Sequence, residues 1–383
     1  MKIGILTYHH AHNYGAFLQA CALCNRLNSE ENLECELIDF RMQKEVNFYS
    51  LSRTSRKVKY LHPSLYRCKK QLFSAFEAAQ KCTFMKKSHD NMLSDSIDDF
   101  VKFVSGKYDV IVTGSDEIWK IDGYRGFPTP YWLPDDLKCG KFAYAASSRS
   151  DFSKLDAQNK QMLTTLVNDF EFIGVREQIT ADQLKSYVAS PEKIHVCCDP
   201  TFLYDFPIRK GNIQKLFKDK IKLNPKKKNI VVMTNIRNVA KHIYNKFSKS
   251  YNLISVFSFH KGYTNAGDIS PIEWLELIAN ADLVISSYFH GTCLSIVKQT
   301  PFITIGSNGR DSKIRPLFFE DNCNFVDRYI PENDFIKQVQ TDEQLEVYFK
   351  KVDTTEYVNR KRAGFPVFLE ALNQYAIRNS NKI

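Results

Sequence analysis

The chain has 383 residues, of which 43% are hydrophobic and 25% are charged, a composition that excludes a disordered or fibrous protein. Its length exceeds the size at which single hydrophobic cores stop growing, so we expect two domains. The formal net charge of +10 favours anionic partners, and the lack of zinc-finger, RNA-binding and basic-zipper patterns argues against nucleic acid.

The chain opens with the apolar run KIGILTY (residues 2–8), which predicts a buried strand. No signal-peptide core or cleavage site accompanies this run, and no stretch reaches the roughly 18 apolar residues that a membrane span needs. We therefore expect a cytoplasmic protein. Its ten cysteines are scattered along a large chain, and we expect them to be reduced.

Residues 15–28 show the pattern of an amphipathic helix. Cys21 and Cys24 are three residues apart in it, which places both on the apolar face with Phe17 and Leu27. No second cysteine pair completes a zinc set. We therefore expect this pair to lie in the core, with redox or metal chemistry as the alternative.

Short apolar strands alternate with helical patterns over the first 205 residues. After the helix, strands are expected at residues 34–40, 108–114, 142–147, 172–177 and 194–200. This alternation predicts a parallel sheet covered by helices. Residues 41–105 are less regular and contain a basic helical insert, RTSRKVKYLHPSLYRCKKQ.

The alternation restarts after a basic stretch that follows residue 205. Four further strands are expected at residues 229–235, 252–258, 282–287 and 301–306. We therefore expect an N-terminal domain at 1–205, with an insert at about 41–105, and a second domain of the same α/β class at 206–332. The remaining segment, 333–383, is expected to be helical and to pack across both domains.

Polar motifs follow several of these strands, at the edge where ligands bind in open parallel sheets. SSYFHGT follows the apolar run DLVI (residues 282–285), and Gly291 would allow close approach of a ligand to a helix N-terminus. His290 could bind a phosphate or deliver a proton. The alternative is a histidine that only caps the helix or contacts a neighbouring loop.

TGSDEIW follows the apolar run YDVIV (residues 108–112). Asp116 could orient a hydroxyl or take its proton, beside Ser115 and Glu117, although Asp and Ser are equally common as helix caps.

HHAHNYGA follows the first strand and holds three histidines within four residues. No acidic or cysteine set at recognised spacing accompanies them, so we expect no metal. Asn13, Tyr14 and Gly15 suit polar ligand contacts at the turn into the first helix.

Cations gather at the same expected edges. Arg176 follows the apolar run FIGV (residues 172–175), and SNGRDSKIRP contributes Arg310 and Lys313. Several cations beside a helix N-terminus would suit an anionic ligand. The alternative for Arg176 is a salt bridge with Glu177.

Taken in order, these motifs resemble those of the polysaccharide pyruvyl transferase family. The matching stretches are HHAHNYGAFLQACAL, DVIVTGSDEIW, FAYAASS, IGVREQ, CCDPTFL, PIEWLELIANADLVISSYFHGTCLSIVKQTPFI and SKIRPLF. The resemblance covers residues 1 to about 320 apart from the basic insert. It implies two Rossmann-like domains whose parallel sheets face each other across a cleft, as in GT-B glycosyltransferases.

The resemblance implies transfer of pyruvate from phosphoenolpyruvate to two hydroxyls of a sugar in a capsule, exopolysaccharide or cell-wall glycan. The product would be a cyclic ketal, formed without a further cofactor. The family's anion site corresponds here to Arg176, His290 and Lys313, where lysine replaces the usual arginine and Arg310 could compensate. Tyr288 also departs from the serine or arginine of many relatives.

The residues fit this chemistry in specific roles. His290 is the candidate acid and, with Gly291, a donor-binding residue, whereas Asp116 is the candidate base. Asn13, Tyr14, Gly15, Ser115 and Glu117 are the candidate acceptor-binding residues. If the acceptor is lipid-linked, the basic insert would contact an anionic membrane at its inner face.

Two other functions remain open at this stage. A GT-B glycosyltransferase would share the fold but use a nucleotide sugar, and a non-catalytic scaffold that binds glycan or lipid would not depend on His290. A dehydrogenase is disfavoured because no G-x-G-x-x-G follows the first strand.

Overall fold

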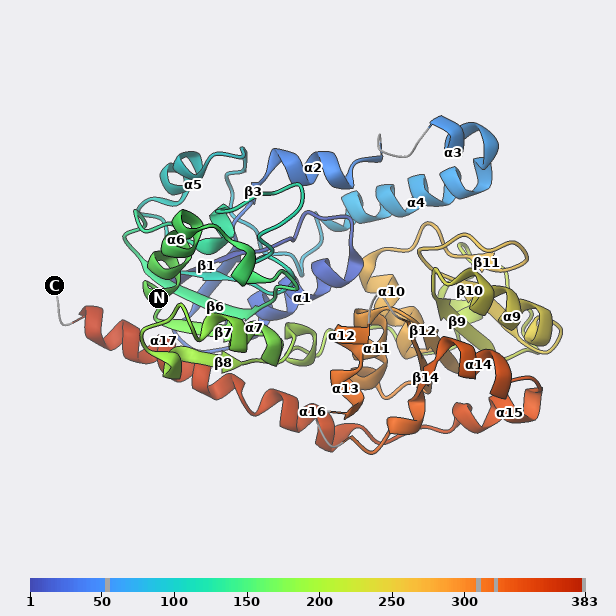
Figure 1. Cartoon of the computed structure of the whole chain (residues 1–383). Helices are drawn as coiled ribbons and strands as arrows, with labels where there is room; N and C mark the ends of the chain where they lie inside the picture. The colour runs from blue at the N-terminus through green and yellow to red at the C-terminus, as the bar shows by residue number, and fades with distance from the viewer. Residues whose placement is uncertain (52–55, 308–310, 320–322, 381–383) are drawn as a thin grey trace. The chain divides into compact units, whose positions relative to one another are not determined.

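The computed structural model describes residues 1–51, 56–307, 311–319 and 323–380. The chain folds into two compact units, each built on a six-stranded parallel sheet (Figure 1). Unit 1 comprises Met1–Ser50, Cys82–Asp205 and Arg360–Ile383, and unit 2 comprises Leu51–Lys81 and Phe206–Asn359. This confirms the predicted α/β class with two Rossmann-like domains.

The sheet of unit 1 has the strand order β2-β1-β5-β6-β7-β8. Its strands are β1 (Lys2–Leu6), β2 (Glu34–Leu37), β5 (Val110–Thr113), β6 (Gly140–Ala146), β7 (Phe172–Val175) and β8 (Ile194–Val196). When the six strands of this sheet are numbered 1 to 6 along the chain, the order is 2-1-3-4-5-6. The direction of winding therefore reverses between β1 and β5. A second, two-stranded sheet pairs β3 (Phe40–Arg41) with β4 (Met92–Leu93).

Helices cover both faces of the unit 1 sheet. The helices are α1 (Tyr14–Leu27), α2 (Gln43–Tyr49), α5 (Ile97–Val104), α6 (Ala157–Asn168), α7 (Gln178–Leu184) and α17 (Phe365–Ser380). Side chains of α5, α6 and α7 join one buried core with alternate residues of the strands. On the other face, α17 packs its ring of Phe368 against Phe142 and Tyr144 of β6.

Helix α1 lies where the sequence predicts a helix, at residues 15–28. The side chain of Asn13 caps its N-terminus by accepting hydrogen bonds from the N–H groups of Gly15 and Ala16. Cys21 and Cys24 are buried with Phe17 and Leu27, which confirms the predicted core face. All ten cysteines are free thiols.

The sheet of unit 2 has the strand order β11-β10-β9-β12-β13-β14. Its strands are β9 (Asn229–Met233), β10 (Asn252–Ser255), β11 (Thr264–Asn265), β12 (Leu283–Ser286), β13 (Phe302–Gly306) and β14 (Tyr329–Pro331). Numbered within the unit, this is 3-2-1-4-5-6, the order of dinucleotide-binding Rossmann folds. Its winding reverses between β9 and β12.

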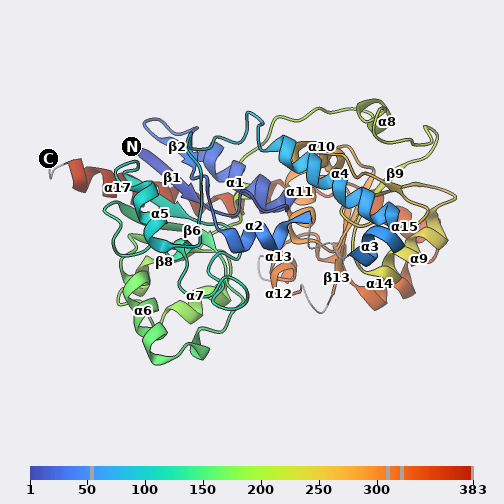
Figure 2. The same cartoon turned by 90° about the horizontal axis from the view of Figure 1, so that it is seen from above.

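The described helices of unit 2 likewise lie on both faces of its sheet. They are α3 (Arg56–Leu61), α4 (Pro63–Ala79), α8 (Ile213–Leu216), α9 (Arg237–Phe247), α10 (Pro271–Ala279), α11 (Phe289–Lys298), α12 (Asp311–Ile314), α13 (Pro316–Phe319), α14 (Glu332–Gln338) and α15 (Asp342–Glu346). Side chains of α9, α14 and α15 form the core on one face. Helix α10 contacts α11 and α4, and Figure 2 shows α4 running beside α10.

The segments divide between the units differently from the predicted domains. The prediction placed the whole basic insert in the N-terminal domain, whereas Leu51–Lys81 belongs to unit 2. The C-terminal segment divides at Asn359/Arg360, within α16 (Thr355–Arg362), and Arg360–Ile383 belongs to unit 1. Long-range contacts decide these assignments, and the sequence pattern does not reveal them.

Candidate functional site

In each unit, the candidate site lies where the winding of the sheet reverses, because the loops diverge there and leave room for a ligand. In unit 1 the two loops follow β1 and β5, and they contain HHAHNYG and GSDE. In unit 2 the two loops follow β9 and β12, and the second leads into α11 with His290. The predicted site residues of both units therefore belong to the loops at these edges or to their neighbours.

The loop after β5 is positioned by close packing against β6. Gly114 has φ +124°, and a Cβ there would lie 2.1 Å from the carbonyl oxygen of Tyr144, so glycine is required. The Ser115 hydroxyl donates to the carbonyl of Ala145 at 2.9 Å. Ser115 is buried, so these contacts give it a structural role, and its predicted acceptor contact stays a prediction.

Acidic side chains surround Arg176 at this edge of unit 1. Its guanidinium contacts Glu177 Oε1 at 2.8 Å and Asp199 Oδ2 at 3.1 Å. Asp116 Oδ1 lies 3.7 Å from its Nη1, and the Ser147 hydroxyl accepts from its Nη2 at 3.3 Å. The alternative considered for Arg176, a salt bridge with Glu177, is thus present.

The environment of Arg176 keeps it charged. Burial alone would lower its pKa, but Glu177, Asp116 and Asp199 raise the pKa well above its usual range. Its side chain is 4% exposed, and three carboxylates already balance its single charge. These contacts favour a role in orienting the carboxylates, and direct binding of an anionic donor by Arg176 stays a prediction.

Three of the four carboxylates in this region are more accessible than Arg176, whereas the side chain of Asp199 is only 1% exposed. The side chains of Asp116, Glu117 and Glu177 are 14–17% exposed. Glu117 also forms a bidentate ion pair with Arg149, whose pKa is raised by that contact. The edge therefore presents partly exposed carboxylate oxygens, which suit sugar hydroxyls.

Buried side chains hold the backbone carbonyl of Glu117 in place. This carbonyl accepts from the Tyr8 hydroxyl at 2.8 Å and from Arg125 Nη1 at 2.9 Å. Arg125 pairs with Glu45 of α2 at 3.0 Å, and His10 Nε2 lies 3.2 Å from the same carboxylate. These contacts connect α2 and the loop after β1 to the loop that carries Asp116.

The remaining predicted residues of the first loop have structural contacts. Asn13 is the N-cap of α1, Tyr14 is 4% exposed, and Gly15 is buried. Their predicted contacts with an acceptor stay predictions. Among the described residues, no group of three His, Cys, Asp or Glu side chains is arranged to hold a metal ion.

In unit 2, hydrogen bonds join the two loops of the candidate site. The Ser287 hydroxyl donates to Thr234 Oγ1 at 2.9 Å, and the Ser287 N–H donates to the Met233 carbonyl at 2.9 Å. His260, in the loop after β10, has its Nε2 3.0 Å from the Thr234 carbonyl. These contacts fix the loop that leads from β12 into α11.

His290 lies in the first turn of α11 and is partly exposed. The helix contains ten residues, and its first turn carries N–H groups that the helix itself does not pair. Its N-cap, Tyr288, makes no side-chain cap bond; its hydroxyl lies 3.4 Å from Ser258 Oγ. The imidazole of His290 therefore lies at the positive end of the α11 helix dipole.

Gly291 has a packing role. A Cβ at this position would lie 2.4 Å from Ser286 Oγ and 3.0 Å from Met233 Cε. Ser286 is held in place because its hydroxyl accepts from the N–H of Tyr288 at 3.0 Å. Glycine is therefore needed for α11 to approach β12, and its contact with a donor stays a prediction.

The predicted basic residues after β13 are partly described. Lys313 belongs to the short helix α12 and is partly exposed. Arg310 lies outside the residues that the structure describes. The described segments that follow β9, β10, β12 and β13 also include Arg237 at the start of α9 and Lys261, and Asp311 is the one carboxylate among them; Asp268 follows β11 and Glu332 follows β14. This edge is thus richer in cations than the carboxylate cluster of unit 1.

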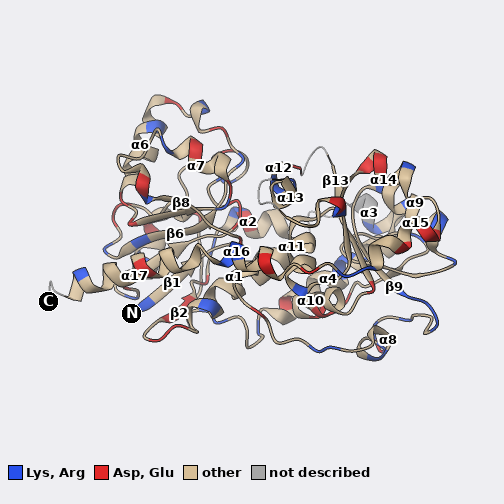
Figure 3. Cartoon of the chain, turned by 90° about the horizontal axis from the view of Figure 1, so that it is seen from below, with Lys and Arg blue, Asp and Glu red and all other residues tan. Residues whose placement is uncertain are grey.

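Charged residues of both signs lie mainly on helices and loops, whereas the strands are largely uncharged (Figure 3).

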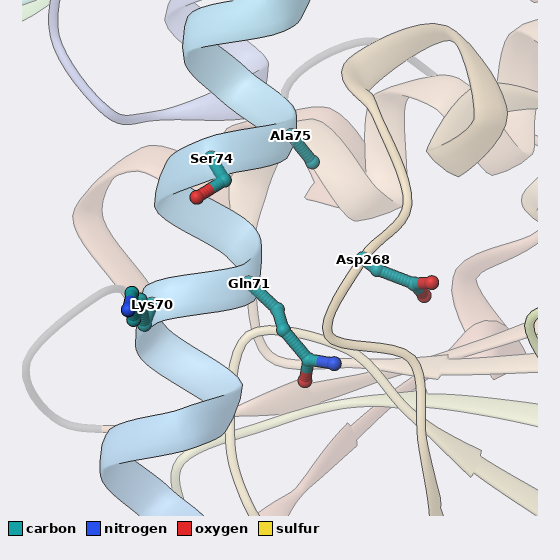
Figure 4. A pocket seen from close by; sticks show the side chains of 5 residues that line it. All are labelled: Lys70, Gln71, Ser74, Ala75 and Asp268. Carbon is teal, nitrogen blue, oxygen red and sulfur yellow. The ribbon is translucent and has the colours of Figure 1, made fainter.

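A pocket of about 370 Å³ lies between α4 and the segment before α10, lined by Lys70, Gln71, Ser74, Ala75 and Asp268 (Figure 4). None of the predicted site residues lines this pocket. In the described chain, no helix is long and apolar enough to span a bilayer.

The sequence matches the profile of the polysaccharide pyruvyl transferase family over residues 13–309. The chain belongs to this family. Membership indicates a transferase, and the matched range contains the candidate residues from Asn13 to Gly291 but not Lys313. A comparison of the sequence with curated proteins finds no match.

Solved structures of sugar-nucleotide epimerases share the fold of this pyruvyl transferase family member. A UDP-N-acetylglucosamine 2-epimerase superposes with a TM-score of 0.54 at 12% identity, covering 98% of this chain and 96% of its own. The UDP-GlcNAc 2-epimerase of Methanocaldococcus jannaschii has a TM-score of 0.52 at 14% identity, covering 92% and 93%. At these identities the similarity establishes the fold alone.

Sequence reasoning missed several residues that shape this candidate site. Asp199 and Arg149 pair with predicted residues, and Glu45 and Arg125 support them from outside the motifs. The position of Asp199 directly after the apolar run IHVCC (residues 194–198) was an available signal. Glu45 lies in an irregular segment, so nothing in the local sequence indicated its partners.

Proposed function

We propose that this family member transfers pyruvate from phosphoenolpyruvate to two hydroxyls of a sugar, forming a cyclic ketal and releasing phosphate. The glycan would be a capsule, exopolysaccharide or cell-wall polymer, or its lipid-linked precursor. The observation that carries the proposal is the family match over residues 13–309, which contains the loop after β5 in unit 1 and the loops after β9 and β12 in unit 2. The charges at these two edges support it.

Unit 1 is assigned the acceptor. The side chains of Asp116 and Glu117 are partly exposed, and sugar hydroxyls donate to carboxylate oxygens. Asp116 is the candidate general base. A base must lie within hydrogen-bond reach of the proton that it removes, and the Asp116 side chain is partly exposed at this edge. Arg176 orients these carboxylates through its contacts with Asp116 and Glu177.

Unit 2 is assigned the donor. Phosphoenolpyruvate carries a phosphate and a carboxylate, and the first turn of α11 with His290 and Lys313 offers N–H groups and cations to both. His290 is the candidate general acid. Lysine at position 313 supplies a point charge but not the planar, two-pronged hydrogen bonding of an arginine.

The proposed reaction balances without a redox partner. A proton added to the methylene carbon of phosphoenolpyruvate makes a methyl group and leaves the central carbon electrophilic. One sugar hydroxyl attacks this carbon and loses its proton, the bond from carbon to the phosphate oxygen breaks, and the second hydroxyl closes the ketal. Of the two hydroxyl protons, one balances the methyl proton and the other leaves with phosphate.

A glycosyl transferase that uses a nucleotide sugar is the second candidate. The observation in its favour is the shared fold with sugar-nucleotide enzymes, one of which was solved with UDP-GlcNAc and UDP. It predicts stabilisation by a nucleotide sugar and release of a nucleotide in place of phosphate. The family match favours pyruvyl transfer.

The test measures phosphate release from phosphoenolpyruvate with a panel of galactosides, mannosides and N-acetylhexosaminides. We expect release that requires an acceptor and falls about 100-fold or more in His290→Ala and in Asp116→Asn, because each removes a group that moves a proton. His89→Ala is the matched control, since the His89 side chain is fully exposed.

The proposal fails if no acceptor elicits phosphate release while a nucleotide sugar, but not phosphoenolpyruvate, raises the melting temperature. Equal rates for His290→Ala and His89→Ala would remove His290 from the chemistry while leaving the reaction class in place.

A further inference from the structure

Residues 51–81 of unit 2 carry most of the net charge of the chain. They include eight Lys or Arg residues and one Glu, a net charge of +7 within a chain of +10. Within this segment, α3 and α4 (residues 56–79) form a two-helix insert whose helices contact each other. Figure 1 shows α3 at the end of α4.

Burial fixes which side of α4 faces outward. Cys68 and Phe76 are buried, and they lie eight residues apart on one side of the helix. Arg67 and Lys70, three residues apart, lie on the opposite side and are exposed. In Figure 4, Gln71 extends toward the segment with Asp268, whereas Lys70 lies on the other side of α4.

Two large apolar side chains are exposed where α3 meets α4. Tyr60 is 72% exposed and Leu61 is 69% exposed, the two highest values among the large hydrophobic residues of the described chain. Lys59 lies beside them, with its Nζ 5.8 Å from the Tyr60 ring and 5.9 Å from the Tyr66 ring. Exposure of adjacent aromatic and aliphatic side chains within a cationic surface needs an explanation beyond stability.

We propose that the outer face of the α3–α4 insert docks on an anionic lipid bilayer. Lys59, Arg67, Lys69 and Lys70 contact the headgroups, and Tyr60 and Leu61 enter the boundary between headgroups and acyl chains. Cations attract the anionic leaflet, while an amphipathic Tyr and a Leu gain by leaving water at that depth. The proposal does not depend on the reaction that the protein catalyses.

The charge and shape of the insert favour a bilayer over a small anion or a nucleic acid. The pocket beside α4 is lined by one cation, Lys70, and one carboxylate, Asp268, so its lining has no net positive charge to hold a phosphate. A nucleic acid would use the cations and could stack on Tyr60, but it offers nothing to Leu61. A lipid surface uses all of these side chains together.

The experiment measures sedimentation of the full chain with phosphatidylcholine vesicles, with and without phosphatidylglycerol. We expect binding only to the anionic vesicles, with a steep loss at high salt because salt screens surface charges. Arg67→Gln/Lys70→Gln is expected to lower the partition coefficient about 30-fold, since each cation near such a surface contributes about fivefold. Lys241→Gln/Lys246→Gln on α9 removes the same charge from another exposed face and should change binding little.

A second variant tests insertion separately from charge. The three native tryptophans are buried, so Tyr60→Trp adds an exposed indole whose emission should shift to the blue with anionic vesicles. No binding to anionic vesicles, equal losses in the α4 and α9 variants, or an unshifted emission of the added indole in bound protein would each overturn the proposal. Retention by a DNA oligonucleotide without vesicle binding would assign the surface to nucleic acid instead.

Discussion

Gly291 shows how a single residue in a functional motif can be required by packing. The motif suggested a ligand contact, and the structure gives the residue a second reason to be glycine, because Ser286 and Met233 occupy the space of a Cβ. The two explanations predict different results, because a packing defect lowers the free energy of unfolding whether or not substrate is present.

We predict that Gly291→Ala lowers the free energy of unfolding by about 2 kcal/mol, the cost typical of overpacking. Ser286 cannot turn away cheaply, because its hydroxyl holds the N–H of Tyr288. Chemical denaturation measures this loss. Gly364→Ala is the control, as a Cβ there meets no atom within 4 Å, and equal stabilities of the two variants would contradict the packing argument.

Asp39 is a carboxylate whose ionisation stabilises unit 1. It accepts from Arg41 at 2.7 and 3.0 Å and from Lys87 at 3.1 Å, and His9 Nε2 lies 3.0 Å away. Burial would raise its pKa, but the contacts with His9 and Arg41 outweigh burial and hold the pKa well below its usual range.

Because the pKa of Asp39 is lower in the folded chain, its stabilising effect is present above the unfolded value of about 4 and is lost as the pH falls below it. We predict that Asp39→Asn lowers the free energy of unfolding by about 3 kcal/mol at neutral pH, since the cations lose their partner. Below about pH 4, the wild type should lose more stability than this variant. Parallel pH profiles, or an equal loss in the exposed Asp135→Asn control, would contradict this account.

At the residue scale, the sequence predicted where polar groups lie and the local pair of Arg176 with Glu177, but not the pairs between distant segments. Asp116, Arg176 and His290 were found because each follows an apolar strand. The ion pairs of Arg176 with Asp199 and Asp116 join three different strand ends, and local sequence does not encode that convergence.

Among the elements, α17 illustrates the part of the fold that depends on distant contacts. Its residue Phe368 packs on Tyr144, Phe172 and Phe142, with ring centroids 4.9, 5.3 and 6.1 Å away. The helix therefore completes one face of the unit 1 sheet, although a long stretch of chain that includes most of unit 2 separates it from β7.

We predict that Phe368→Ala lowers the free energy of unfolding by about 4 kcal/mol, because it removes a fully buried ring from the interface between α17 and the sheet. Thermal or chemical unfolding measures the loss. The neighbouring Val367 is 49% exposed, and Val367→Ala should cost less than about 0.5 kcal/mol. Similar losses for both variants would show that α17 does not pack as described.

Strand prediction succeeded for the strands of four or more residues and for the three-residue β8, and it missed four other short strands. The expected runs correspond to β1, β2, β5, β6, β7, β8, β9, β10, β12 and β13. The strands β3, β4, β11 and β14 contain two or three residues, and too few apolar positions distinguish such pieces from loops. The reversal points that locate both candidate sites depend on sheet order, which emerges only from the structure.

At the scale of the whole molecule, the sequence predicted two domains of one fold class but not which segments each contains. Unit 1 collects three separate segments and unit 2 collects two. The basic segment 51–81 looks locally like an insertion into the first domain, but α4 contacts α10, and Cys68 and Gln71 lie beside Gly267, so the segment belongs to unit 2.

The account of the whole molecule assigns a cation-rich edge of unit 2 to the donor and a carboxylate-rich edge of unit 1 to a sugar. The most direct test follows phosphoenolpyruvate labelled with ¹³C at its methylene carbon, using NMR of the product formed with an active acceptor. The account predicts that the label appears as the methyl group of a ketal joined to two oxygens of the sugar. Label that remains in phosphoenolpyruvate or appears only in free pyruvate, with an unchanged sugar, would contradict it.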